Sequence, residues 1–98
     1  MNYGKNLIDV VQRLGPDYSI RIIDGENVGY RLTENGYEIE ISGLDNNKKG
    51  LKAAVFVWRL SPREIVRRKF DLTSIREVLH AVRVIEELVP HPQALEEE

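Results

Sequence analysis

The stretch that decides the fold is VGYRLTENGYEIEI, residues 28–41. On both sides of Asn35-Gly36, apolar and polar side chains alternate with a period of two, which is typical of strands with one buried face. A two-residue hairpin turn needs positive φ at both central positions, and Asn-Gly adopts this conformation at low cost. The stretch therefore predicts two antiparallel strands joined by a tight turn.

Similar patterns extend the sheet in both directions. Residues 18–23 alternate and precede an Asp24-Gly25 turn, which predicts one more strand before the hairpin. Residues 51–60 are apolar on both faces and predict a long strand, central in the sheet or covered on both sides by helices. Residues 62–70 fit two structures equally: a short helix that starts with proline and a capping box, or a fifth strand in which basic and apolar side chains alternate.

Amphipathic patterns at the two ends of the chain predict helices. Asn6 is expected to cap a first helix that ends at Gly15-Pro16. Ser74 and Glu77 form a capping box at the start of a second helix, which Pro90 stops. The apolar side chains of this second helix keep helical spacing over four turns, so they form one broad face for packing.

These elements predict an α+β fold: an antiparallel sheet of four or five strands with the N- and C-terminal helices packed on one face. We expect residues 1–89 to form a single domain and residues 90–98, rich in proline and glutamate, to be a disordered tail. The predicted core consists of the apolar stripe of the last helix together with Tyr18, Ile20, Ile22, Tyr30, Leu32, Ile39, Ile41, Val55 and Val57.

Composition narrows the class of protein. The chain has 98 residues and no cysteine, which excludes a thiol nucleophile, a thiolate zinc site and a disulfide scaffold. The longest apolar run, residues 53–58, is too short to span a membrane, and no signal pattern precedes it. No metal-ligand spacing and no glycine-rich phosphate loop occurs. We expect a cytoplasmic protein with no metal, no cofactor and no membrane contact.

Residues suited to catalysis are few. His80 is predicted on the polar face of the second helix, one turn after Arg76, with no carboxylate placed to orient its ring, and His91 falls in the predicted tail. Glu38 and Glu40 alternate on one strand face and fit a solvated face better than an acid–base pair. Because no nucleophile is paired with a base, we expect that the protein is not an enzyme.

Charge is distributed unevenly along the chain. The formal net charge is −2. Residues 59–83 carry an excess of basic side chains, whereas all formally charged side chains of residues 84–98 are glutamates. Such a basic stretch fits the acidic surface of a partner protein or the phosphates of a nucleic acid. The predicted binding residues are Arg59, Arg63, Arg67, Arg68, Lys69, Arg76, His80 and Arg83.

The order of a helix, a three-stranded meander and a closing helix resembles small phage-encoded proteins, including type II anti-CRISPR inhibitors. The resemblance covers about the first 45 residues. Inhibitors of that kind often imitate DNA with an acidic surface, whereas this chain is nearly neutral, so their binding residues are not carried over. The residues that carry the resemblance are Leu7-Ile8, Asp17-Tyr18, Gly25 and Asn35-Gly36-Tyr37-Glu38-Ile39.

Together these observations predict a small non-enzymatic protein-binding module. The resemblance implies an inhibitor or adaptor from a phage or mobile element that acts by covering a partner's surface, such as an anti-CRISPR protein. The alternative is a nucleic-acid-binding protein that uses the basic stretch 59–83. A homodimer joined through an unpaired sheet edge also stays open.

Overall fold

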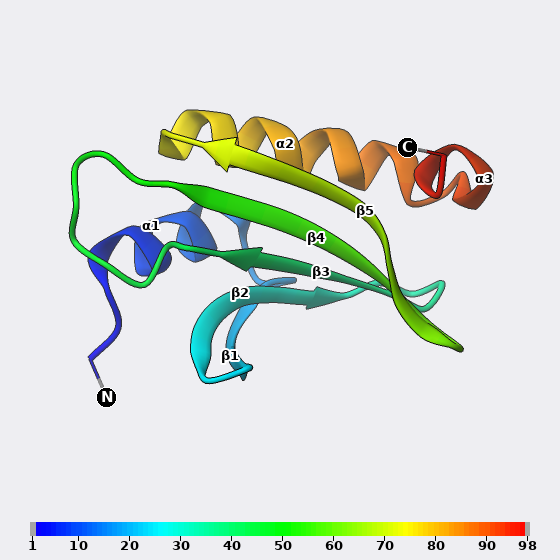
Figure 1. Cartoon of the computed structure of the whole chain (residues 1–98), viewed down its shortest axis with the longest axis horizontal. Coiled ribbons are helices and arrows are strands. Elements are labelled where there is room, and N and C mark those ends of the chain that lie inside the picture. The colour runs from blue at the N-terminus through cyan, green and yellow to red at the C-terminus, as the bar shows by residue number, and fades with distance from the viewer. Residues whose placement is uncertain (1, 98) are drawn as a thin grey trace.

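The computed structural model describes residues 2–97, so Met1 of the predicted domain and Glu98 of the predicted tail lie outside the described residues. Five strands form one antiparallel sheet in which each strand pairs with its neighbours in chain order (Figure 1). This architecture confirms the predicted α+β fold. The elements are α1 (Lys5–Leu14), β1 (Ser19–Ile23), β2 (Glu26–Leu32), β3 (Tyr37–Ser42), β4 (Ala53–Leu60), β5 (Arg63–Leu72), α2 (Ile75–Leu88) and α3 (Pro92–Leu95).

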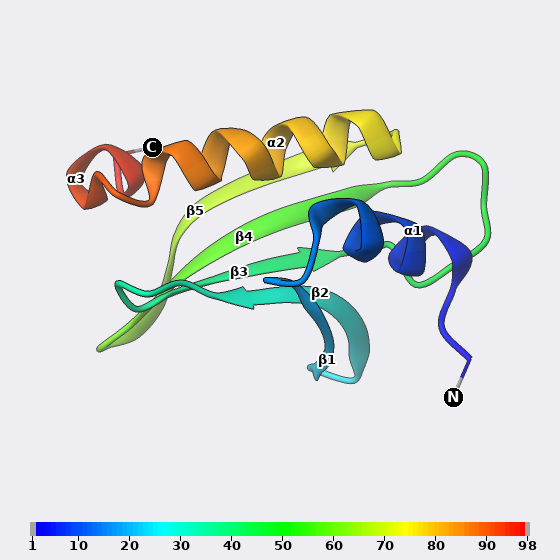
Figure 2. The ribbon, with the colours of Figure 1, turned by 180° about the vertical axis from the view of Figure 1, so that it is seen from behind.

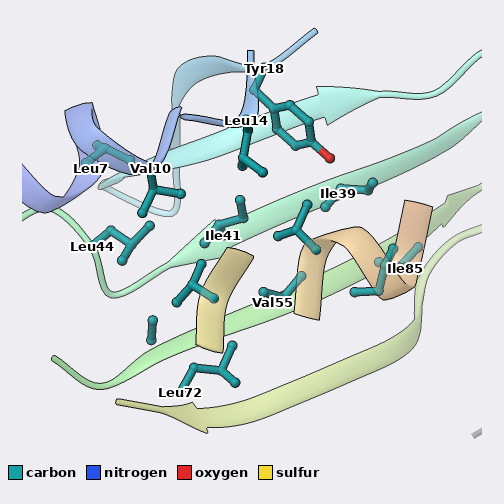
Figure 3. Packing of buried hydrophobic residues seen from close by; sticks show 14 of the residues in the cluster. Leu7, Val10, Leu14, Tyr18, Ile39, Ile41, Leu44, Val55, Leu72 and Ile85 are labelled. Carbon is teal, nitrogen blue, oxygen red and sulfur yellow. The ribbon is translucent and has the colours of Figure 1, made fainter. Parts of the chain in front are cut away.

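Helices α1 and α2 pack on the same face of the sheet, as predicted (Figures 1 and 2). Figure 3 shows the apolar side chains of α1 and α2 meeting those of the central strands. Ile39, Val55 and Val82 are each 0% exposed, and the core therefore lies between the helices and β3–β4. The longest helix has 14 residues, and none of the helices in residues 2–97 combines the length and apolar composition of a membrane span.

The two hairpin turns of the sheet have lengths and φ angles that the sequence did not predict. The loop after β2 has three residues between Thr33 and Tyr37, and within it only Gly36 has positive φ, at 86°. This is the three-residue type of hairpin, in which a left-handed glycine follows an ordinary turn. The two-residue turn with positive φ at both positions lies instead at Asp24-Gly25, between β1 and β2.

The ambiguous segment 62–70 belongs to a strand. β5 pairs with β4 from Leu60↔Arg63 to Ala53↔Leu72, which rules out the helical alternative. The physical reason is burial, because Val66 and Leu72 reach the core only when this segment lies beside β4. β5 is the last strand of the sheet, so its outer edge has no strand partner among residues 2–97.

The start of α1 differs from the prediction, whereas the start of α2 agrees with it. Gly4, not Asn6, is the N-cap of α1, and a Cβ at Gly4 would lie 2.1 Å from the backbone nitrogen of Asn46. Asn6 is buried inside the helix and its side-chain amide donates to Asn46 Oδ1 at 2.7 Å, holding the 45–50 loop. The Ser74 hydroxyl accepts a hydrogen bond from the backbone N–H of Glu77 at 3.1 Å, so the predicted cap of α2 is confirmed.

Two predicted core residues are exposed, since Ile22 is 67% exposed and Leu32 is 56% exposed. Leu32 pairs with Glu38 and Tyr30 pairs with Glu40, so both lie on the face away from the helices, where Tyr30 is buried. Alternation gives the period of a strand but neither the face that the helices cover nor how far they extend along it.

The tail predicted to be disordered is folded in the described residues. Residues 92–95 form α3, and Leu95 is 0% exposed within the core cluster. Arg59 Nη1 donates to Glu96 Oε1 at 2.6 Å. The prediction of disorder from composition was therefore wrong for residues 92–96, because one leucine finds an apolar site that the sequence pattern does not reveal.

Candidate functional site

A groove of about 700 Å³ lies between β5 and α2, at the free edge of the sheet. β5 and α2 run side by side in both views of the ribbon (Figures 1 and 2). This volume is within the range typical of ligand sites. The side chains that line the groove are Arg67, Arg68, Lys69 and Leu72 of β5 and Arg76, Glu77, His80, Ala81, Val84 and Ile85 of α2.

The two elements supply the cations of the groove in different ways. On β5, three consecutive residues line it, because an edge strand leaves the side chains of both faces near its free side. On α2, Arg76 and His80 are one helical turn apart and so lie on the same side of the helix. The fold thereby brings together five of the eight predicted binding residues, Arg67, Arg68, Lys69, Arg76 and His80.

Glu77 is the acidic member of the lining, and its carboxylate is engaged with the start of α2. Glu77 Oε1 accepts from the backbone N–H of Thr73 at 2.9 Å and from the Thr73 hydroxyl at 2.7 Å. These hydrogen bonds to Thr73 hold the pKa of the Glu77 carboxyl below its usual range. Glu77 therefore serves as a helix cap within a groove that is otherwise cationic and apolar.

Arg67 lies at the end of the groove nearest α3. Its Nη1 donates to the backbone carbonyl of Glu97, two residues after Leu95 of α3, at 3.2 Å. A backbone carbonyl of the chain is thus bound by one of the arginines that line the groove.

The other three predicted binding residues lie outside the groove, each in an ion pair. Arg59 pairs with Glu64 and Glu96 on the helix-covered side of the sheet, near α3. Arg83 Nη1 donates to Glu86 Oε1 at 2.7 Å on the side of α2 that faces α1. Arg63 lies on the opposite face of the sheet. A run of basic residues in sequence is therefore split by the fold into one cluster and three separate pairs.

Arg63 belongs to a layer of stacked side chains on the open face of the sheet. Its guanidinium lies over the ring of Trp58 and its Nε donates to Glu38. Glu40 is only 8% exposed, and burial raises the pKa of its carboxyl. The expectation that Glu38 and Glu40 are solvated was wrong, because tryptophan and arginine side chains from β4 and β5 cover them.

A second polar cluster joins α2 to β1 and β2 on the helix side. The Tyr18 hydroxyl donates to Glu86 Oε2 at 2.7 Å, and Arg31 Nη1 donates to the same oxygen at 3.1 Å. Burial, then the hydrogen bond to Glu86, raises the pKa of Tyr18. Burial alone would raise the pKa of Glu86, but hydrogen bonds from Arg83 and Tyr18 outweigh burial and lower this pKa. This cluster is fully paired and stabilises the packing of α2.

The sequence analysis missed the apolar floor of the groove. Val84 is 40% exposed there and follows His80 by one turn, as His80 follows Arg76. The spacing of four residues from 76 to 80 to 84 would have placed all three on one stripe of the helix. Arg83, another predicted binding residue of α2, points instead toward α1.

No protein-family model, curated protein or solved structure matches this chain. Within residues 2–97, no group of three or more histidine, aspartate and glutamate side chains is arranged to hold a metal ion. The chemistry of the groove is therefore the guide to function.

Proposed function

We propose that this chain is a non-enzymatic protein-binding module that docks an acidic segment of a partner protein in the groove between β5 and α2. One observation carries the proposal: β5 and α2 together gather four cations, Arg67, Arg68, Lys69 and Arg76, and the imidazole of His80 around one groove. Like charges held close together repel, and an acidic partner relieves this repulsion as it binds. Such a cluster also speeds the encounter with an acidic surface.

The apolar floor favours a protein over a nucleic acid. Leu72, Ala81 and Val84 supply apolar side chains to the lining, together with the cations of β5 and Arg76 of α2. Burial of apolar surface contributes about 25 cal/mol per Å², which a phosphate backbone does not provide. An apolar centre with charged groups at its rim is the usual composition of a protein interface.

The proposal includes a mode of action. The groove is lined by cations, apolar side chains, the imidazole of His80 and one carboxylate, that of Glu77. Because Glu77 binds Thr73 and caps α2, the set suits binding better than proton transfer. The resemblance to small phage-encoded inhibitors implies a stoichiometric inhibitor or adaptor that covers a partner's surface. We place this action in the cytoplasm.

The test is co-purification from the native host with a matched pair of charge-reversal variants. R67E/K69E/R76E changes three cations of the groove, and K5E/K48E/K49E changes three exposed cations outside its lining by the same total charge. We expect the wild-type protein and the control variant to elute in a discrete complex that the groove variant fails to form. Equal complex formation by both variants would contradict the proposal.

Nucleic-acid binding is the second candidate, and one observation favours it. Phe70 follows Lys69 in β5, is 53% exposed, and packs edge to face on Phe56 with ring centroids 5.6 Å apart. An exposed ring beside cations is a surface on which bases stack. This function predicts binding of single-stranded DNA of about 20 nucleotides, an affinity that falls steeply with salt, and loss of binding in F70A. Tight, salt-sensitive binding of this kind without any protein complex would replace the first proposal.

A further inference from the structure

We infer that the partner segment docks in an extended conformation, as a sixth strand on the free edge of β5, with acidic side chains flanking an apolar one. This inference rests on the proposed function and adds the conformation and composition of the ligand. Three observations carry it: the unpaired edge of β5, the wall that α2 forms beside this edge, and the distribution of charge.

The free edge of β5 offers backbone groups to an added strand. Residues 67–69 pair in regular register with Val57, Phe56 and Val55, between two register shifts in the β4–β5 ladder. Consecutive residues of an antiparallel strand alternate in the side to which they turn their N–H and C=O groups. Either Arg68, or Arg67 together with Lys69, therefore points both groups to the free edge. An edge of this kind is a template for strand addition.

Helix α2 places a wall beside this edge. A strand added to β5 lies about 4.8 Å from it. The groove lies alongside β5, with a lining that comes from β5 on one side and from the 76, 80 and 84 stripe of α2 on the other. Successive side chains of the added strand point to opposite faces, so alternate ones reach α2 and Val84 receives an apolar side chain.

The charge on the edge selects the occupant. Pairing of β5 with β5 of a second copy would set Arg67, Arg68 and Lys69 against like charges, which is destabilising. The same cations attract an acidic strand, so they reject this chain's own edge and accept a partner of opposite charge. β1 forms the other edge of the sheet. Its cation, Arg21, is stacked over the ring of Tyr30, with the guanidinium carbon 4.3 Å from the ring centroid.

The chain itself contains a contact of similar composition, made by the end of helix α3. In the segment after α2, Leu95 is buried, the carboxylate of Glu96 binds Arg59, and the carbonyl of Glu97 binds Arg67. An apolar side chain followed by acidic residues thus already contacts the sheet next to the groove. The groove continues this surface with further cations and with Val84 in its lining.

The experiment measures fluorescence anisotropy of a labelled peptide, acetyl-EETEVETEE-amide, with the full-length protein. We expect saturable binding, with about tenfold or greater loss for the matched lysine peptide acetyl-KKTKVKTKK-amide. Two further peptides carry N-methyl groups on alternate backbone amides, in the odd or the even positions. Only one edge of an added strand faces β5, so one methylated peptide should lose about tenfold in affinity or more and the other should keep most of it.

The protein variants and the remaining outcomes separate the inference from the proposed function. R67E/K69E/R76E should lose the acidic peptide, and K5E/K48E/K49E should retain it. Equal affinity of the parent and both methylated peptides would overturn strand addition while leaving the groove as a protein-binding site. In another outcome, the wild-type protein fails to bind the peptide while the native complex still depends on the groove. That result would overturn the inference that the ligand is an extended acidic segment. A dimer that R67E/K69E/R76E dissociates would make a second copy the occupant instead.

Discussion

Arg63 lies over the indole of Trp58, with its guanidinium carbon 3.9 Å from the ring centroid, on the sheet face away from the helices. The Arg63 Nε also donates to Glu38 Oε1 at 3.3 Å, and Trp58 Nε1 donates to Glu40 Oε1 at 2.8 Å. Side chains of β4 and β5 therefore hold both carboxylates of β3. The open face of the sheet is a layer of cations, rings and carboxylates, which fixes how β5 lies against β4.

The buried Glu40 makes one part of stability fall as pH rises. Burial raises the pKa of Glu40 above its ordinary value of 4.5, so the folded state binds more protons than the unfolded state in the range just above that value. We expect E40Q, which still accepts from Trp58, to gain stability relative to wild type from pH 4 to pH 7. Urea unfolding at several pH values measures this difference, and a difference that is constant with pH would contradict it.

Glu86 should give the opposite pH dependence. Its pKa is lowered below 4.5 by hydrogen bonds from Arg83 and Tyr18, in spite of burial. A lowered pKa stabilises the fold above pH 4.5 and loses this effect as pH falls through the folded-state pKa. We expect E86Q to cost about 1–3 kcal/mol at pH 7 and less in acid, because it leaves partly buried donors unmatched. E87Q, an equal change of charge at an exposed neighbour, is the control in thermal unfolding.

The face that α2 turns to the sheet can be checked with two substitutions of the same type. Val82 is 0% exposed and Val84 is 40% exposed. V82A should lower the free energy of unfolding by about 2 kcal/mol, because it removes apolar contacts and leaves a cavity. V84A should change stability by less than about 0.5 kcal/mol. Similar urea midpoints for the two variants would place a different face of α2 against the core.

Leu95 provides a test of the folded segment after α2. It is 0% exposed within the core cluster, next to the ion pair between Arg59 and Glu96. L95A should cost about 2–5 kcal/mol in chemical unfolding, as for other buried leucines. The exposed Ala94 nearby offers a control, since A94S should have little effect. A stable L95A protein would mean that this segment does not pack on the domain.

The groove was only partly predictable. The basic residues from 59 to 83 are visible in the sequence, and five of them do form the groove. The separation of Arg59, Arg63 and Arg83 from that cluster depends on the register of β5 against β4 and on the rotation of α2, which no local pattern specifies. The apolar floor, with Val84 at its centre, depends on the same two relations.

The sequence by itself determined the local structure. The alternation around Asn35-Gly36 specifies a hairpin, and Ser74 with Glu77 specifies where α2 begins, because these preferences act over a few neighbouring residues. Only the tertiary structure decided that residues 63–72 form a strand, that Leu95 is buried and that cations of β5 and α2 face one groove. Burial and the facing of side chains from two elements depend on how whole elements pack on one another, so their energies are absent from any local pattern.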